Sequence, residues 1–184
     1  MNEFELKKNN QLEKKDKSSI GSWDSKIVKL CGKVNKKKNY YTTSSCSGRV
    51  VLLKESEKKA RDLFLFRKHG KISFQELKKA LEKTEYKGLV YFKQEPCILH
   101  VACFSLDDAQ DLVNKAKLAG WKRSGIMSIK RNMIELLSTE QLSFPIMDNG
   151  SILVSDNFLK LVVKESNKKL EKVWKKISRL KELI

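Results

Sequence analysis

Residues 40–53 read YYTTSSCSGRVVLL, and the order of residue types in this stretch predicts its local structure. Tyrosines and threonines stand at its start, and Val50, Val51 and Leu52 stand near its end. Aromatic and β-branched side chains favour extended strands, whereas the small residues Ser44 to Gly48 between them favour a turn. We therefore expect one strand, a serine-rich loop and a second strand.

The flanking sequence predicts further strands and helices. Strand-forming side chains are concentrated in residues 87–93, 97–104, 124–129 and 132–137. Apolar residues recur every three to four positions in residues 26–34, 73–83, 105–119 and 156–184, which predicts four helices. Side chains suited to N-caps precede three of these helices: Asp24 or Ser22, Ser73 with Glu76, and Ser105 with Asp108.

These elements predict an α+β fold with a mixed sheet, interleaved helices and a long amphipathic C-terminal helix. A Rossmann fold is not expected, because the regular alternation of strands and helices and the GxGxxG motif are both missing. We expect residues 1–184 to form a single domain, with residues 1–20 partly flexible.

The composition points to a polyanionic partner. The chain has 184 residues and a net charge of +17, which favours nucleic acid, an anionic membrane surface or an acidic protein. Because 33 of the basic residues are lysines and only 6 are arginines, a general lysine-rich composition is the alternative explanation. The basic loop Lys36, Lys37 and Lys38 is the expected RNA-binding segment, and Tyr40, Tyr41 and Trp23 beside it would stack on unpaired bases.

The sequence also indicates a compartment. No apolar stretch is long enough to cross a membrane, and the N-terminus lacks the apolar region of a secretory signal. The four cysteines form no CxxC pair, so we expect reduced thiols, no metal site and a cytoplasmic location.

The serine-rich loop is the strongest candidate for a binding site. Its small residues would let backbone N–H groups turn toward an anion, and Arg49 would bind a carboxylate or phosphate with two donors. The alternative is a polar turn whose hydroxyls satisfy only their own backbone. Cys46 would act as a nucleophile only with a nearby base, for which His69 and His100 are the candidates. His100 is either a general base or a hydrogen-bonded structural residue of its strand.

The chain resembles the family of methyltransferases that act in the third step of wybutosine synthesis on tRNA. The resemblance rests on motifs spread in order along nearly the whole chain, of which the string TTSSCSGR at residues 42–49 is the most specific. The other matching positions include Asp16-Lys17-Ser18, Gly21, Asp24, Val34-Asn35, His69, Pro96, Leu99-His100-Val101, Gly120, Ser124-Gly125-Ile126, Ser138-Thr139, Pro145 and Asn167.

The resemblance implies a specific reaction. Family members transfer a methyl group from S-adenosylmethionine to a ring nitrogen of the wyosine base next to the anticodon of phenylalanine tRNA. For this reaction we hypothesise that His100 is the catalytic residue, which orients or deprotonates the reacting base. The implied cofactor- or substrate-binding residues are Asp24, Thr43, Ser44, Ser45, Cys46, Ser47, Gly48, Arg49, Ser124 and Gly125.

Two positions depart from the family pattern. Leu137 stands where arginine is common, and Ile20 stands where lysine is common, so two contacts to phosphate or carboxylate would be missing. The alternative function is a non-catalytic RNA-binding module whose serine loop holds a phosphate. The oligomeric state is left open.

Overall fold

A computed structural model describes residues 2–14, 24–56 and 62–184. The chain divides into two compact units. The first comprises Met1–Ser47, Cys97–Thr139 and Val173–Ile184, and the second comprises Gly48–Pro96 and Glu140–Lys172. The prediction of one domain over residues 1–184 is not tested by this division and stays a prediction.

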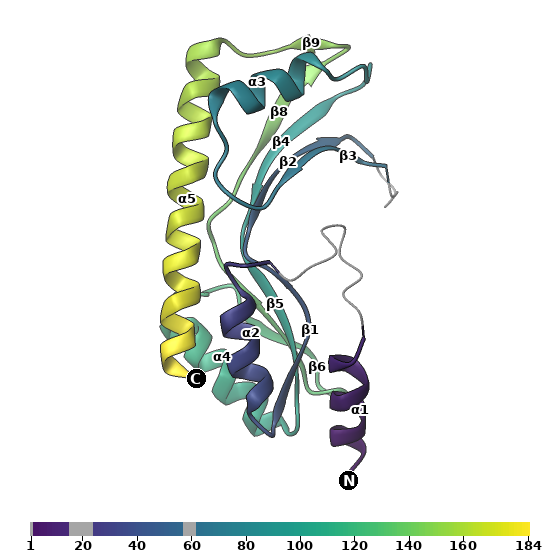
Figure 1. The fold of residues 1–184 in the computed structure, drawn as a ribbon, viewed down its shortest axis with the longest axis vertical. Coiled ribbons are helices and arrows are strands. Elements are labelled where there is room, and N and C mark those ends of the chain that lie inside the picture. Colours follow the sequence, from purple (N-terminus) through teal and green to yellow (C-terminus); the bar gives the residue numbers. More distant parts are fainter. Residues whose placement is uncertain (1, 15–23, 57–61) are drawn as a thin grey trace. The chain divides into compact units, whose positions relative to one another are not determined.

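The first unit is built on a four-stranded antiparallel sheet in the order β1-β5-β7-β6. Its strands are β1 (Tyr40–Cys46), β5 (Ile98–Cys103), β6 (Gly125–Ser128) and β7 (Met133–Leu137). The helices of this unit are α1 (Glu3–Leu12), α2 (Val28–Lys36), α4 (Leu106–Leu118) and the last turns of α5 (Asp156–Leu183). Figure 1 shows α2, α4 and the end of α5 on one face of this sheet and α1 on the other.

The core of the first unit lies between the sheet and the helices α2, α4 and α5. Alternate residues of β5, Leu99 and Val101, are fully buried in it, as is Trp121 after α4. The indole N–H of Trp121 donates to the carbonyl of Lys176, 3.2 Å away, which satisfies its polar atom inside the core. Because side chains alternate along a strand, the neighbouring residue His100 lies on the opposite, α1-bearing face.

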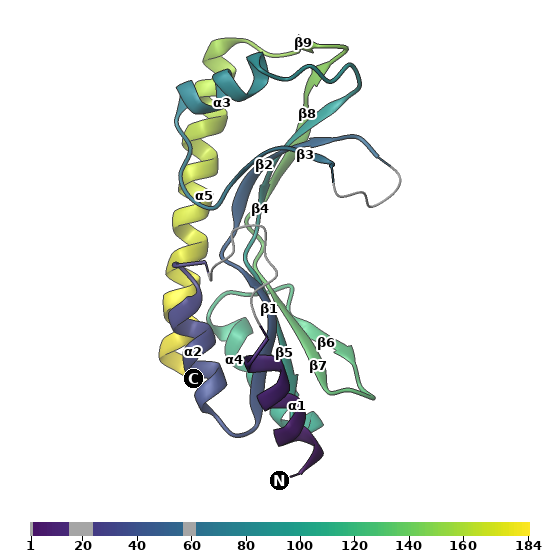
Figure 2. The same ribbon diagram turned by 45° about the vertical axis from the view of Figure 1, so that its right-hand side comes forward.

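The second unit contains a five-stranded antiparallel sheet in the order β3-β2-β4-β8-β9. Its strands are β2 (Arg49–Lys54), β3 (Phe64–Lys68), β4 (Val90–Glu95), β8 (Leu142–Asp148) and β9 (Ser151–Ile152). Helix α3 (Phe74–Glu82) and the first turns of α5 lie on one side of this sheet (Figure 2).

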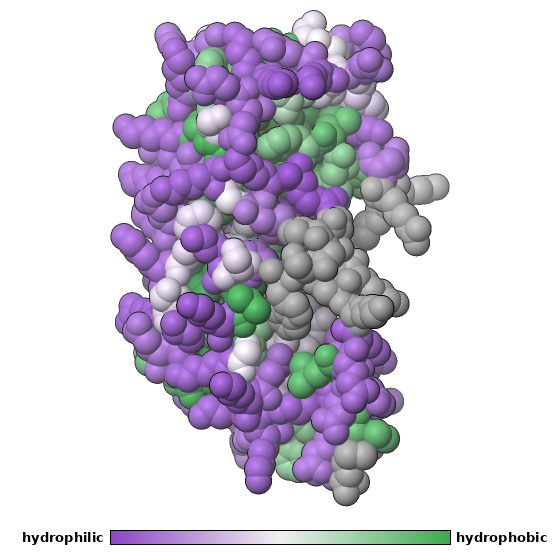
Figure 3. All heavy atoms as spheres, viewed as in Figure 1, coloured by the Kyte–Doolittle hydropathy of each residue, from purple (hydrophilic) through white to green (hydrophobic). Residues whose placement is uncertain are grey.

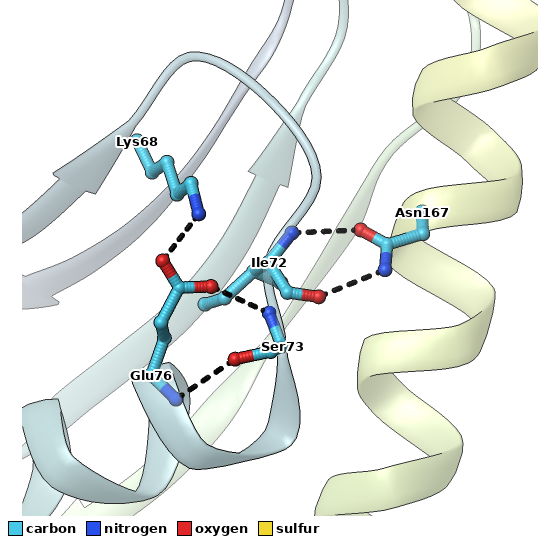
Figure 4. A network of polar contacts seen from close by, with 5 residues as sticks. All are labelled: Lys68, Ile72, Ser73, Glu76 and Asn167. Atoms are coloured by element: carbon cyan, nitrogen blue, oxygen red, sulfur yellow. Dashed lines mark hydrogen bonds and ion pairs between the residues drawn. The ribbon is translucent and has the colours of Figure 1, made fainter.

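A polar network fixes the segment between β3 and α3 (Figure 4). Ser73 and Glu76 form the predicted capping box, and Glu76 also pairs with Lys68. The side-chain amide of Asn167 on α5 makes two hydrogen bonds to the backbone of Ile72, accepting at 2.9 Å and donating at 2.8 Å. Ile72 is buried, so these bonds satisfy peptide groups that water does not reach.

Helix α5 is amphipathic, as predicted. Its buried residues recur at helical spacing, among them Leu159, Leu170 and Leu180. Figure 3 shows hydrophilic side chains along the outer side of this helix. They also cover most of the molecular face drawn in that figure. Among the described residues, no helix combines the length and the apolar character needed to cross a membrane.

The α+β class without a Rossmann arrangement is confirmed, with the strands divided between two antiparallel sheets. Four elements, α1, β3, β8 and β9, were not predicted. Of the segment 1–20 that we expected to be partly flexible, residues 3–12 form α1, and residues 15–20, including Ile20, lie outside the described residues.

The predicted N-cap of the first core helix is wrong. Helix α2 begins at Val28, and its N-cap is Ile27, which makes no side-chain hydrogen bond. The carboxylate of Asp24 instead accepts hydrogen bonds from the backbone N–H groups of Lys26 and Ser47. Ser22, the other candidate, lies outside the described residues.

Candidate active site

The serines of the TTSSCSGR string lie mostly in a strand and not in a loop. Ser44, Ser45 and Cys46 belong to β1 and pair with β5, so the predicted loop over residues 44–48 is wrong for these three. A β-bulge at Thr43 shifts the register and places Ser44 opposite His100. The extra residue of a bulge redirects the side chains that follow it, so Ser44 shares the face of His100.

The register of the first sheet aligns four residues across its four strands. Ser44 on β1 pairs with His100 on β5, His100 pairs with Glu135 on β7, and Glu135 pairs with Gly125 on β6. We call these four residues the polar row. They share one face of the sheet, because side chains directly opposite each other in a ladder point the same way.

Hydrogen bonds connect three members of the polar row. The hydroxyl oxygen of Ser44 lies 2.7 Å from Nδ1 of His100, and Oε2 of Glu135 lies 2.9 Å from Nε2 of the same ring. An ionised carboxylate only accepts hydrogen bonds, so Nε2 carries the proton of the neutral imidazole. Nδ1 is then an acceptor, and the Ser44 hydroxyl donates to it.

The polar row is reachable from solvent. Ser44 is exposed, and the side chains of His100 and Glu135 are 25% and 32% exposed. At the end of the row, a Cβ atom added to Gly125 would find no atom within 4 Å. A substrate group can therefore approach the hydroxyl and the carboxylate on this face.

The hydroxyls of Thr43 and Ser45 have structural partners. Thr43 donates from its hydroxyl to the carbonyl of His100, 3.4 Å away. Ser45 hydrogen-bonds the thiol of Cys31 on α2, on the core side of the sheet. Burial raises the pKa of that thiol to about 11, so Cys31 stays protonated near neutral pH.

The turn at the end of β1 forms a hydrogen bond to the carboxylate of Asp24. The backbone N–H of Ser47 donates to Oδ2 of Asp24 at 2.9 Å. The predicted anion nest is therefore wrong at Ser47, because its N–H is already paired with a carboxylate. Asp24 orders this turn, and Cys46 ends the strand opposite Ile98.

Gly48 and Arg49 begin the second unit. Gly48 has φ of +92°, and an added Cβ would lie 3.0 Å from the carbonyl oxygen of Glu95, so the backbone itself requires glycine there. Arg49 donates from Nε to the carboxylate of Glu95, and its guanidinium lies 5.0 Å from the ring centre of Phe64. The positive charge of Arg49 thus has an acidic partner within its own unit.

Comparison with known proteins identifies the family. The model of the TYW3 methyltransferase family matches residues 5–184. The chain belongs to this family. A relative from Thermococcus sibiricus, named tRNA(Phe) 7-((3-amino-3-carboxypropyl)-4-demethylwyosine(37)-N(4))-methyltransferase, is 33% identical over 98% of this chain and 94% of its own length. A relative from Danio rerio, named tRNA wybutosine-synthesizing protein 3 homolog, is 35% identical over 98% of this chain and 74% of its own length.

A solved structure of the PH1069 protein from Pyrococcus horikoshii has the same fold. It superposes with a TM-score of 0.87 at 32% identity and covers 97% of this chain and 92% of that one. The family resemblance drawn from the sequence is thereby confirmed, and so is the enzyme class, a tRNA methyltransferase. Membership of the TYW3 family favours an enzyme over the non-catalytic RNA-binding module.

Ser124, which we expected to bind the cofactor or the substrate, makes hydrogen bonds within the protein. Ser124 is buried, donates from its hydroxyl to the carbonyl of Trp121 at 2.6 Å and accepts from the N–H of Leu137 at 3.1 Å. Its side chain therefore has no exposed polar atom to offer a cofactor. Leu137 itself shares the face of Glu135, two residues along β7.

The predicted stacking role of Tyr40 is wrong. Its side chain is buried, and its hydroxyl donates to the carbonyl of Asp108 and the carboxylate of Asp111. Burial, together with these two aspartates, raises the pKa of the Tyr40 hydroxyl. The ring of Tyr41 packs 5.1 Å from that of Phe4 on α1.

The basic loop that we expected to bind RNA is exposed to solvent. Lys36, Lys37 and Lys38 are exposed at the turn between α2 and β1. Trp23, the third aromatic residue expected to stack on bases, lies outside the described residues.

Glu135 is the member of the polar row that we did not predict. The segment Met133–Leu137 contains four apolar residues and one acidic residue, and that acidic residue is unusual in a half-buried strand. This pattern was a signal in the sequence. Its partner, however, is 35 residues away, and only the register of β5 and β7 brings the two together.

Proposed function

We propose that this chain transfers a methyl group from S-adenosylmethionine to a ring nitrogen of the wyosine-type base beside the anticodon of phenylalanine tRNA. The names of the relatives support the tRNA and the base. The observation that carries the proposal is the hydrogen-bonded chain of Ser44, His100 and Glu135 on an accessible sheet face. We place the reaction in the cytoplasm, where the four free cysteines stay reduced.

The polar row fits a donor such as S-adenosylmethionine, which supplies a methyl group activated by a positively charged sulfur. The Ser44 hydroxyl and the Glu135 carboxylate are oxygen groups suited to the ammonium and hydroxyl groups of that molecule. Gly125 leaves open space beside Glu135. These three residues would hold the donor or the acceptor base against the sheet.

The chain of hydrogen bonds provides a route for the proton that leaves the acceptor nitrogen. Ser44 is the exposed end of the chain, so its oxygen takes the proton from the nitrogen as its own proton passes to Nδ1 of His100. The imidazole becomes an imidazolium ion. The carboxylate of Glu135 holds the ring in place through Nε2 and stabilises the positive charge.

Catalysis by this site depends on orientation as well as on proton transfer. The three side chains stand on three adjacent strands, whose backbone pairing fixes their spacing. A rigid sheet holds reacting groups in one geometry better than a loop does. The bulge at Thr43 thus contributes directly to the function, because it sets the register that brings Ser44 to His100.

A transfer assay tests the proposal. The protein is incubated with S-adenosylmethionine labelled in its methyl group and with tRNA from a strain that lacks this methylation step. We expect label in phenylalanine tRNA, located in the wyosine base after nuclease digestion. The matched control is phenylalanine tRNA with an unmodified guanosine at that position, which should accept no label. Absence of label from the precursor tRNA would overturn the proposal.

A further inference from the structure

The hairpin between β6 and β7 ends in a surface that the polar row does not include. Figure 2 shows this hairpin projecting from the sheet of the first unit. Its turn contains Ile129, which is 72% exposed, and the exposed cations Lys130 and Arg131. Met127, 57% exposed, precedes the turn, and Phe104, 55% exposed, lies next to it. We call these five residues the hairpin-tip surface.

Hydrogen bonds attach the turn of the hairpin-tip surface to the neighbouring strand β5. Asn132 adopts φ of 47°, and its N–H donates to the carbonyl of Ile129 at 3.1 Å, which closes the turn. Its side-chain amide donates to the carbonyl of Phe104 at 3.1 Å, and its own carbonyl accepts from Cys103. The turn is therefore attached to the end of β5, so its exposed apolar side chains do not depend on a loose loop for their position.

Phe104 stands on the same face of the sheet as the polar row. Its backbone continues the pairing of β5 with β1, through a hydrogen bond to Asn39, and its ring meets that of Phe4 edge to face at 5.5 Å. Four residues of extended chain separate it from His100, which corresponds to about 13 Å. That distance is about four stacked nucleotides at about 3.4 Å each.

The chemistry of the hairpin-tip surface suits single-stranded RNA. Exposed aromatic side chains stack on unpaired bases, whereas paired bases present no free face to them. Lys130 and Arg131 supply positive charge for the phosphates on either side. A group of exposed apolar side chains that is bordered by charged residues is typical of a binding site.

We infer that the hairpin-tip surface binds unpaired nucleotides of an RNA loop while the polar row acts on a base of that loop. The inference rests on the proposed function for the kind of RNA, and it adds the element that recognises the loop. The remaining stem would be bound through its phosphates by other cations of the chain.

Binding of short RNAs to the full-length protein tests the inference. The probes are a fluorescent hairpin with the sequence of the phenylalanine anticodon arm and a blunt duplex of the same stem. We expect Phe104→Ala to weaken hairpin binding by about 5- to 150-fold, the range given by the loss of one base–aromatic stack. Duplex binding should not change, because the duplex has no unpaired base.

A second variant guards against disturbance of the Phe4 contact. Ile129→Ser combined with Arg131→Gln alters only exposed side chains, and it should also weaken hairpin binding more than duplex binding. The matched control is Leu118→Ser with Lys117→Gln on α4, which removes one exposed aliphatic group and one cation from the other face of the sheet. The control should bind both RNAs as the wild type does.

Two outcomes would overturn the inference. One is hairpin binding by both hairpin-tip variants that equals wild type, and the other is an equal loss of hairpin and duplex binding. Failure of the proposed function has a different signature, since label transfer to tRNA would then be absent. Selective loss of hairpin binding in the two variants would still support the inference in that case.

Discussion

His100 has a carboxylate on one ring nitrogen and a hydroxyl on the other, and this arrangement assigns different tasks to its two neighbours. Glu135 fixes the proton on Nε2, while Ser44 connects Nδ1 to the solvent side of the sheet. The imidazole itself does not need to touch the substrate. In the proposed mechanism Ser44 therefore meets the acceptor base, and His100 is the base that acts through it.

At this scale, replacement of Ser44 gives a direct prediction. Ser44→Ala removes the relay and should lower kcat by about 10²-fold, in the range for general base catalysis, with the thermal unfolding midpoint unchanged because the side chain is exposed. Steady-state kinetics and a thermal melt measure the two effects. Ser143→Ala is the matched control, since Ser143 is also an exposed serine in a strand. Equal kcat in the two variants would contradict the relay.

Individual elements were predictable where their signals are local. The capping boxes at Ser73 and Ser105 depend on residues three positions apart, and both were predicted and are present. The pairing of β1 with β5 depends on residues 56 positions apart, and no local pattern specifies it. For this reason His100 was recognised as a candidate, whereas its hydrogen-bond partners emerged only from the sheet register and the bulge at Thr43.

The secondary structure of the small polar residues could not be predicted either, because it depends on distant pairing partners. The serines of TTSSCSGR suit a turn or a bulged strand, and the pairing partner decides between them. Arg49 could not be assigned to a ligand or to Glu95 from the sequence, because Glu95 lies 46 positions away.

The attachment of the β3–α3 segment to α5 gives a prediction for stability. Asn167→Ala removes two hydrogen bonds and leaves the buried peptide groups of Ile72 unsatisfied, which should cost about 1–3 kcal/mol of unfolding free energy. Chemical denaturation measures this cost. Asn157→Ala, at an exposed position of the same helix, is the control and should change the free energy by less than about 0.5 kcal/mol. Equal stability of the two variants would show that the amide of Asn167 is not required.

The cap of α3 gives a prediction for pH. The ion pair with Lys68 and the backbone N–H of Ser73 lower the pKa of Glu76 to about 2. A pKa that is lower in the folded protein stabilises the fold above the unfolded value of 4.5, and this contribution is lost as pH falls from 4.5 toward 2. Glu76→Gln should therefore be less stable than wild type at pH 6, with the difference shrinking by pH 3. A difference that does not depend on pH would contradict this assignment.

At the scale of the whole molecule, the net charge of +17 agrees with the polyanionic substrate of a tRNA methyltransferase family. The charge alone left nucleic acid, membrane and acidic protein open, and it was the TTSSCSGR string that pointed to the family. The polar row contains one acidic and no permanently positive residue. In the proposed function the cations therefore bind the polyanion, and the sheet face carries out the chemistry.

This division predicts a strong salt dependence of tRNA binding. Each phosphate neutralised by a lysine or arginine releases counterions, so affinity should fall by about 10³-fold or more between about 50 and 200 mM salt if about six phosphates are contacted. Filter binding over a salt series measures the slope. Affinity for tRNA that does not change with salt would show that the basic residues do not hold the RNA.

The central claim is that the polar row carries out methyl transfer, and the single-turnover rate of His100→Asn tests it most directly. Asparagine keeps a polar side chain in the strand but offers no basic nitrogen. With precursor tRNA and S-adenosylmethionine both saturating, we expect the rate of label transfer to fall by about 10²- to 10⁴-fold, while tRNA binding stays at the wild-type level. A rate equal to that of the wild type would contradict the account.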